Sequence, residues 1–161
     1  MFRALDLALL RLLRTRGHAP IFELAVVHYS RLGNHGTLWL VLAAGGTLLD
    51  GARRPAYLRA FGAVVLTLAV NYAVKVSIRR ARPLLEDLPP LSPTLSSLSY
   101  PSAHASTSFA GASALSRAVP GRPLLGLAVA MALSRPYLGI HYPSDVLAGA
   151  ALGTAIAKLL P

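Results

Sequence analysis

The sequence predicts an all-α, polytopic membrane helix bundle of about five to six helices with an N-terminal amphipathic interfacial helix. Two observations carry this prediction. The 161 residues are 54% hydrophobic and 14% charged, whereas soluble domains average about 25% charged residues. Apolar runs of helical length also recur between turns rich in proline and glycine. We expect one domain over 1–161, with interfacial helices in 1–35 and the main helix bundle in 36–160.

The first segment, residues 2–16, has leucines at helical spacing, with Arg3, Arg11 and Arg14 off the apolar stripe. A cleavable signal peptide keeps its cations ahead of the apolar run, so this segment is not typical of one. An amphipathic helix lying in the membrane interface is the favoured interpretation, and an ordinary surface helix packed on the protein is the alternative. Residues 21–31 predict a short helix whose charged side chains make it a poor membrane span.

The remaining helices are predicted from apolar runs and their breakers. The run 57–79 is the cleanest, since it is long enough to cross a hydrocarbon core about 30 Å thick, and proline ends it at Arg82-Pro83. Residues 83–101 predict an ordered loop. The small residues Gly149 and Gly153 predict close helix packing. Further helices are expected at 37–50, 103–118, about 123–135 and 144–160.

The chain has a formal net charge of +10 and no cysteine. Disulfides and thiolate metal sites are therefore excluded. The arginines punctuate apolar runs and form no aromatic-interleaved stripe, so membrane lipids and an anionic substrate are the expected partners, and nucleic acid is not. If the helices alternate, one side of the membrane receives six cations, namely Arg53, Arg54, Arg59, Arg117, Arg122 and Lys158.

The positive-inside rule makes that side cytoplasmic. The composition, rich in alanine and arginine, indicates a bacterial chain, so we expect a plasma-membrane protein with its functional motifs on the extracytoplasmic face. The N-terminal arginines share the motif side if residues 17–35 do not cross the membrane.

The first motif is a pair of cations, Lys75 and Arg82, followed by Pro83. Seven residues are about two helical turns, so the pair is predicted to stack on one helix face and to bind two edges of one phosphate group. Long cations also reach toward lipid headgroups. That alternative is expected for Arg79 and Arg80.

The second motif, Ser102-Ala103-His104, opens a helix directly after Pro101. A helix N-terminus presents unpaired amide donors and partial positive charge, which favours an anion. Ser102 is interpreted as a helix cap or a phosphate ligand. His104 lies in the first turn, beside the same space.

The third motif combines Arg135, His141 and Asp145. Asp145 alone would be explained as an acid near a helix N-terminus. Because it lies four residues after His141, it can also bind one imidazole nitrogen and leave the other free to attack. Pro143 makes an ideal helical turn uncertain, so a compact non-helical turn is the alternative geometry. Arg135 can reach the same anion.

A metal site built from the two histidines and Asp145 is the chemical alternative. The nearby cations Lys75, Arg82 and Arg135 argue against it, because they would repel a bound metal ion. We therefore expect no metal and no other cofactor.

In their order and spacing the three motifs resemble the signature of the type-2 phosphatidate phosphatase superfamily, the lipid phosphate phosphatases. The match covers three parts: Lys75, Arg82 and Pro83; Pro101, Ser102 and His104; and Ser134, Arg135, His141 and Asp145. One position departs, since Ala103 stands where the family usually has glycine. Alanine keeps the amide N–H but limits backbone freedom. The first 35 residues lie outside the resemblance.

The resemblance implies a membrane enzyme that dephosphorylates a polyprenyl phosphate or glycerolipid phosphate through a phosphohistidine. His141 would attack phosphorus, oriented by Asp145, and His104 would serve as general acid and then base. The phosphate oxygens would be held by Lys75, Arg82, Ser102, Ala103 and Arg135.

Two other functions stay open at this stage. A non-catalytic lipid-binding module with a degenerate site is the main alternative, which Ala103 favours and the intact His104, His141 and Asp145 oppose. A vanadium-dependent haloperoxidase would use the same oxyanion site, but that family is soluble and its members are much larger.

Overall fold

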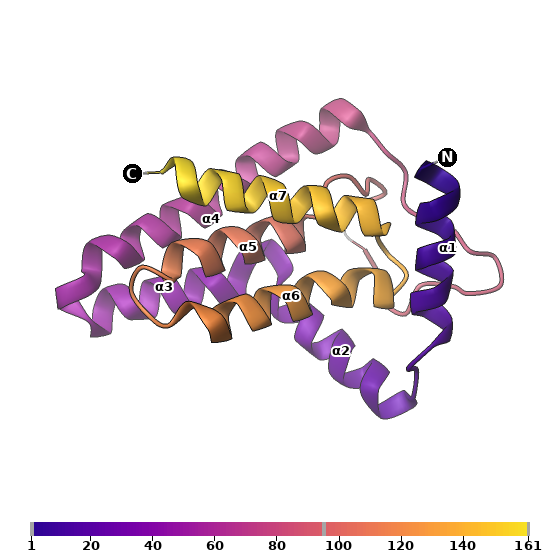
Figure 1. Cartoon of the computed structure of the whole chain (residues 1–161), viewed down its shortest axis with the longest axis horizontal. Helices are drawn as coiled ribbons and strands as arrows, with labels where there is room; N and C mark the ends of the chain where they lie inside the picture. The colour runs from indigo at the N-terminus through magenta and orange to yellow at the C-terminus, as the bar shows by residue number, and fades with distance from the viewer. Residues whose placement is uncertain (1, 95, 161) are drawn as a thin grey trace.

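The computed structural model describes residues 2–94 and 96–160. Within them are the seven α-helices of Figure 1 and two short 3-10 helices, η1 and η2. In chain order the elements are α1 (Phe2–Thr15), α2 (Pro20–Leu32), η1 (Asn34–Gly36), α3 (Thr37–Leu49), η2 (Gly51–Arg53), α4 (Arg54–Ile78), α5 (Ala103–Leu115), α6 (Gly121–Tyr137) and α7 (Pro143–Leu159). The predicted all-α fold with an N-terminal helix is confirmed, and the predicted helices recur with ends shifted by a few residues.

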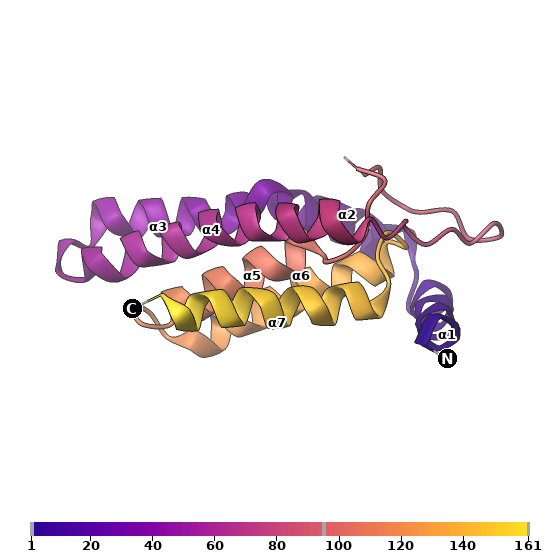
Figure 2. The same ribbon diagram turned by 90° about the horizontal axis from the view of Figure 1, so that it is seen from above.

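The bundle has two layers, which Figure 2 shows edge-on: α2, α3 and α4 form one layer, and α5, α6 and α7 form the other. Helix α5 lies at the centre and packs against α3, α4, α6 and α7. Helix α1 lies across one end of the bundle (Figure 1). If the bundle crosses a membrane, α1 therefore lies along the membrane surface.

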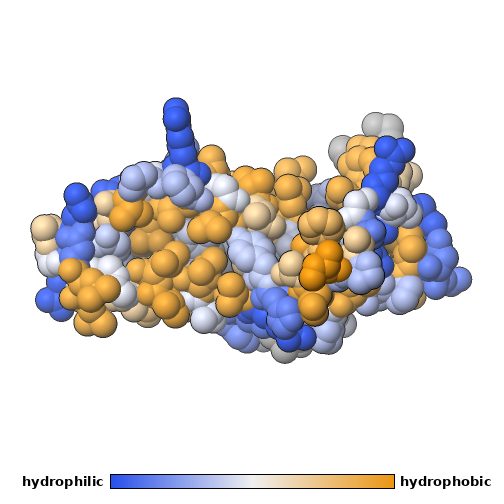
Figure 3. All heavy atoms as spheres, turned by 90° about the horizontal axis from the view of Figure 1, so that it is seen from below, coloured by the Kyte–Doolittle hydropathy of each residue, from blue (hydrophilic) through white to orange (hydrophobic). Residues whose placement is uncertain are grey.

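The surface of the bundle is that of a membrane protein. Among the described residues, one helical stretch, Gly51–Ile78, is by itself long and apolar enough to cross a bilayer. The other helices of the bundle core, α3, α5, α6 and α7, have 13 to 17 residues, and about 20 residues are needed for a full span. Large apolar side chains face outward, as at Leu49 and Leu147, which are 90% and 71% exposed. Figure 3 shows such residues over the middle of one face, with hydrophilic residues mainly toward its two ends.

Two glycines let α7 touch the backbone of α5. A Cβ added at Gly153 would lie 1.9 Å from the carbonyl oxygen of Ser106, and one added at Gly149 would lie 2.6 Å from that of Ser102. Real side chains never approach so closely, so only glycine fits either position. The close packing predicted from this pair is observed, and it brings the N-terminal ends of α5 and α7 together.

Helix α1 buries two charged side chains and one leucine against the bundle and exposes several other leucines. Asp6, Leu10 and Arg14 are buried at four-residue spacing, and the Arg14 guanidinium donates to the carbonyl oxygen of Pro89 at 2.8 Å. The leucine stripe that was predicted as the apolar face of the helix is exposed, with Leu5 at 57% and Leu12 at 45%. This arrangement suits a helix whose leucines enter the membrane interface while its polar face contacts the bundle.

Gly153→Ala tests the contact between α5 and α7. The added methyl group must push two backbones apart, so we expect a loss of about 1–3 kcal/mol of stability and a lower Tm in detergent. Gly126→Ala in α6 is the matched control, because a Cβ there meets nothing within 4 Å and alanine favours a helix. A Tm equal to wild type in Gly153→Ala would contradict this packing.

Candidate active site

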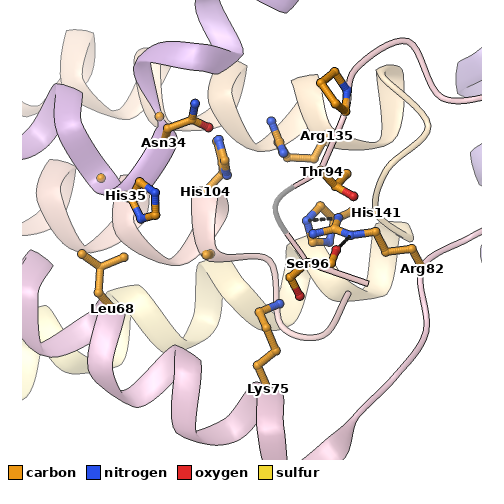
Figure 4. Close-up of a pocket in the computed structure, with 14 residues that line it drawn as sticks. Asn34, His35, Leu68, Lys75, Arg82, Thr94, Ser96, His104, Arg135 and His141 are labelled. Atoms are coloured by element: carbon orange, nitrogen blue, oxygen red, sulfur yellow. Dashed lines mark hydrogen bonds between the residues drawn. The ribbon is translucent and has the colours of Figure 1, made fainter. Parts of the chain in front are cut away.

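A cavity of about 150 Å³ opens at the end of the bundle nearest α1. Its walls come from α4, the loop after it, η1 and the facing ends of α5 and α6. Figure 4 shows cationic and imidazole side chains from these segments around one space. Six of the eight residues singled out in the sequence line it, namely Lys75, Arg82, Ala103, His104, Arg135 and His141.

Lys75 and Arg82 reach the cavity from different kinds of backbone. Lys75 lies in the last turn of α4, where its ammonium group donates to the carbonyl oxygen of Pro101 at 3.0 Å. The prediction that the pair stacks on one helix face is wrong. Helix α4 ends at Ile78, because Arg79 takes a left-handed conformation with φ of 52°. Arg82 therefore projects from the loop that follows.

Arg82 bridges the loop and the imidazole of His141. Its Nη1 lies 2.6 Å from the carbonyl oxygen of Ile140 and 3.0 Å from His141 Nε2. A guanidinium group can only donate hydrogen bonds, so Nε2 is the acceptor. In the neutral ring the proton is then on Nδ1, and Nε2 holds a lone pair at the wall of the cavity.

The environment of His141 keeps its imidazole neutral. The side chain is almost fully buried, with 2% exposed. This burial and, next, the positive charge of Arg82 lower the pKa of His141 well below its usual range.

Asp145 lies behind His141 and does not line the cavity. Its Oδ2 is 3.5 Å from His141 Nδ1 and accepts the backbone N–H of Tyr142 at 3.0 Å. His141 precedes α7, so a compact turn closed by the Tyr142 contact makes this approach. The non-helical alternative considered for Pro143 is the one observed. Asp145 is completely buried.

The second motif forms the N-terminus of α5. Ser102 is its N-cap, and its hydroxyl accepts the N–H of Ala105 at 3.5 Å. The Ser102 N–H donates to the carbonyl oxygen of Asp145 at 3.0 Å, which joins the starts of α5 and α7. Ser102 is fully buried and does not line the cavity, whereas Ala103 and His104 do.

His104 and Arg135 both contact Ser30 of α2. His104 Nε2 lies 3.2 Å from the Ser30 carbonyl oxygen, and the Arg135 guanidinium donates to the Ser30 hydroxyl. Because a carbonyl oxygen only accepts, Nε2 of His104 carries a proton, and Nδ1 is left to exchange one with a ligand. Arg135 Nε is buried and has no hydrogen-bond partner within the described ranges.

Sequence analysis missed the contributions of the first 36 residues. Ser30 contacts two site residues, and Asn34 and His35 of η1 line the cavity beside His104. His35 has a left-handed backbone with φ of 51°, which is uncommon for a residue other than glycine. That conformation depends on how η1 packs, so no local pattern in the sequence signals it.

Arg80 was also interpreted wrongly. It was expected to reach toward lipid headgroups, but its guanidinium donates to Asp145 Oδ1 at 2.7 Å and to Asp6 Oδ2 at 2.7 Å. The signal in the sequence was the scarcity of acids, since the chain has only six. A carboxylate that is buried where a helix such as α1 packs needs a cation nearby. Asp6 is paired with Arg80.

The cavity is built for an anion. Three cations, Lys75, Arg82 and Arg135, surround it, and the N-terminus of α5 adds amide donors and partial positive charge. Within residues 2–94 and 96–160, no three histidine, cysteine or acidic side chains gather as a metal-binding group. The arrangement can hold a tetrahedral oxyanion between two imidazoles, and the Nε2 lone pair of His141 accepts from Arg82 in the structure.

Comparison with known proteins agrees with this geometry. The family model of the PAP2 superfamily matches residues 56–161. The chain is 40% identical over 135 residues to the decaprenylphosphoryl-5-phosphoribose phosphatase of Mycobacterium tuberculosis, covering 81% of this chain and 74% of that one.

Two crystal structures of bacterial proteins share the fold. LpxE of Aquifex aeolicus superposes with a TM-score of 0.82 at 25% identity, covering 96% of this chain and 93% of that one. The PAP2-type phosphatidylglycerolphosphate phosphatase of Bacillus subtilis gives 0.80 at 24% identity, covering 99% and 84%. With the family match and the relative at 40% identity, the chain belongs to the PAP2 superfamily and is a membrane phosphatase.

Proposed function

We propose that this phosphatase removes phosphate from a lipid phosphomonoester or pyrophosphate through a phosphohistidine on His141, without a metal ion. One observation carries the proposal: the acceptor nitrogen Nε2 of His141 lies at the wall of a cavity ringed by three cations. The lone pair of a neutral imidazole, held beside a bound phosphate, is positioned to attack phosphorus as a nucleophile.

In the first step, His141 Nε2 attacks phosphorus and forms a P–N bond while the bond to the leaving oxygen breaks. Nδ1–H faces Asp145, whose carboxylate stabilises the positive charge that develops on the ring. Arg82 leaves Nε2 and moves its N–H groups to the phosphate oxygens, which Lys75 and Arg135 also contact. These fixed cations stabilise the transition state electrostatically, as a metal ion would.

His104 completes both steps by moving one proton. In the first step His104 acts as the doubly protonated imidazolium ion, whose charge the bound phosphate offsets, and it gives its Nδ1 proton to the leaving oxygen, since Nε2–H is committed to the Ser30 carbonyl. In the second, Nδ1 accepts a proton from a water molecule that attacks phosphorus, and the P–N bond breaks to release inorganic phosphate. Ser102 and the Ala103 amide are proposed as further oxyanion contacts. The hydroxyl of Ser102 would have to leave its cap to take part.

The substrate class we propose is a polyprenyl-phosphoryl phosphosugar. The relative at 40% identity is named for such a substrate. A groove lined by Leu68, Tyr72 and Val76 of α4 shares Lys75 and His35 with the cavity, so a lipid-linked substrate has apolar surface directly beside the phosphate position.

We also propose that the site faces the extracytoplasmic side of a bacterial plasma membrane. The two connections at the far end of the bundle, between α3 and α4 and between α5 and α6 (Figure 1), together with the first turns of α4 and α6 that follow them, carry five cations, namely Arg53, Arg54, Arg59, Arg117 and Arg122. The positive-inside rule applied to these two connections makes the far end cytoplasmic. The proposal rests on the connections alone, since the rule counts cations whether or not they are paired and Arg3, Arg11 and Arg14 of α1 lie at the site end.

His141→Ala tests the mechanism. We expect phosphate release from a polyprenyl-phosphoryl phosphosugar to fall by about 10⁴-fold or more, because the nucleophile is gone. Wild-type release should survive EDTA. An alkaline quench, which preserves a phosphohistidine, should trap ³²P from the labelled phosphate of the substrate on His141. Release abolished by EDTA would overturn the metal-free mechanism. No release from any lipid phosphate would favour a non-catalytic lipid-binding module.

The protonation of His141 gives a second prediction. Because the pKa of His141 is lowered from 6.5, the neutral nucleophile persists as the pH falls through 6.5 and is lost only below the lowered pKa. We expect the ¹⁵N resonances of its ring to stay in the neutral form at about pH 6, assigned by their loss in His141→Gln. A titration midpoint at or above 6.5 would contradict the environment described.

The absence of cysteine from the sequence allows a direct test of orientation. Glu86→Cys lies in the exposed loop at the site end, and Ala52→Cys lies in the α3–α4 connection. We expect a membrane-impermeant maleimide added to intact cells to label the first and not the second. The reverse pattern would place the site in the cytoplasm.

A further inference from the structure

The N-terminal helix α1 carries a buried carboxylate that the proposed mechanism does not use. Asp6 is 6% exposed, on the face of α1 that contacts the bundle. Taking a carboxylate out of water is costly unless it is paired. A buried ion pair adds little net stability compared with apolar packing, so leucines would hold α1 in place at least as well. The charge of Asp6 therefore calls for another explanation.

The partner of Asp6 is also the partner of Asp145. Arg80 donates from Nη2 to Asp6 Oδ2 at 2.7 Å and from Nη1 to Asp145 Oδ1 at 2.7 Å. The guanidinium carbon of Arg80 lies 4.1 Å above the centre of the Tyr142 ring. This stacking fixes the plane of the guanidinium group. Two carboxylates and one aromatic ring thus hold the guanidinium in a single orientation.

A second set of contacts ties Asp6 to the start of α7. Ser144 donates its backbone N–H to Asp6 Oδ1 at 2.9 Å, and its hydroxyl also donates to Asp6. Burial acts to raise the pKa of the Asp6 carboxyl, but hydrogen bonds from Arg80 and Ser144 outweigh burial and lower that pKa. Asp6 is therefore ionised whenever the enzyme is folded near neutral pH.

This geometry determines which oxygen of Asp145 faces His141. Arg80 occupies Oδ1, and Oδ2 is left toward the Tyr142 N–H and His141 Nδ1. Without Asp6, the Nη2 group of Arg80 has lost its carboxylate partner. Because the Arg80 side chain is 27% exposed, it can then turn toward water or lipid headgroups. Asp145 would then keep the Tyr142 N–H on Oδ2 but lose the hydrogen bond on Oδ1 that helps to fix its rotation.

We propose that Asp6 and Arg80 are positioning residues, through which α1 orients Asp145 and, in turn, the His141 imidazole. Neither touches the phosphate. This inference rests on the proposed phosphohistidine mechanism and extends it to a segment that precedes the family match at residues 56–161. On this proposal, the contact of α1 with the bundle is needed for full catalytic activity.

The test compares Asp6→Asn and Arg80→Gln with wild type on the same lipid phosphate. We expect kcat to fall about 10- to 100-fold in Arg80→Gln and up to about tenfold in Asp6→Asn, the range typical of groups that orient a catalytic side chain. KM and the inhibition constant of inorganic phosphate should stay within about threefold, because the phosphate-binding cations are untouched. Asp6→Glu should recover part of the lost kcat.

Asp87→Asn is the matched control. It also removes an ion pair that tethers α1, through Arg11, but this pair is exposed and distant from Asp145. We expect wild-type kcat in Asp87→Asn. An equal loss in Asp87→Asn and Asp6→Asn would mean that Asp6 only tethers the helix. Wild-type kcat in both Asp6→Asn and Arg80→Gln would overturn the proposal.

The two proposals fail differently. If His141→Ala keeps wild-type activity, the phosphohistidine mechanism is wrong whatever Asp6 does. If His141→Ala is inactive while the Asp6 and Arg80 variants have wild-type kcat, only the positioning role is wrong. The Tm of each variant in detergent accompanies the kinetics, and a lowered kcat at unchanged Tm supports positioning.

Discussion

The backbone contact between α5 and α7 is the constraint on which the site depends. Gly149 and Gly153 remove two side chains from this interface, and the Ser102 N–H then reaches the carbonyl oxygen of Asp145. His104 follows Ser102, and His141 lies four residues before Asp145, so this one contact brings the two imidazoles to the same cavity. A wider spacing between the helices would separate the two imidazoles. The two glycines of α7 thus position the site as well as allowing the close packing.

Charge placement is the second constraint, because the site lies at one end of a bundle with an apolar surface. Lys75 and Arg82 are held by backbone carbonyl oxygens, and Arg135 by Ser30. These acceptors fix the positions of the cations without neutralising them, so they remain able to stabilise a phosphate group. The carboxylates, in contrast, lie behind the cavity, where Arg80 joins Asp145 to Asp6. Positive charge faces the cavity, and negative charge lies behind His141 on the far side.

The sequence predicted the helices and the residues of the three motifs that gather at the cavity, because apolar periodicity and motif spacing are local properties. It did not predict where α4 ends, since the left-handed conformation of Arg79 is decided by the loop that follows. Nor did it predict Ser30, Asp6 or the partners of Arg80. Each acts through contacts across 65 or more positions of the chain, and only the packing of α1 and α2 against the bundle creates them. An N-terminal segment without motifs therefore supplies contacts that no motif in the catalytic half reveals.

The central claim is that one imidazole nitrogen and three fixed cations share a single oxyanion. Orthovanadate mimics the transferring phosphoryl group, so a crystal structure of the protein with vanadate tests this claim most directly. The account predicts vanadium bonded to Nε2 of His141, with Lys75, Arg82 and Arg135 on its equatorial oxygens and His104 on the opposite side. Vanadate bonded to another residue, or bound with His141 out of reach, would contradict it.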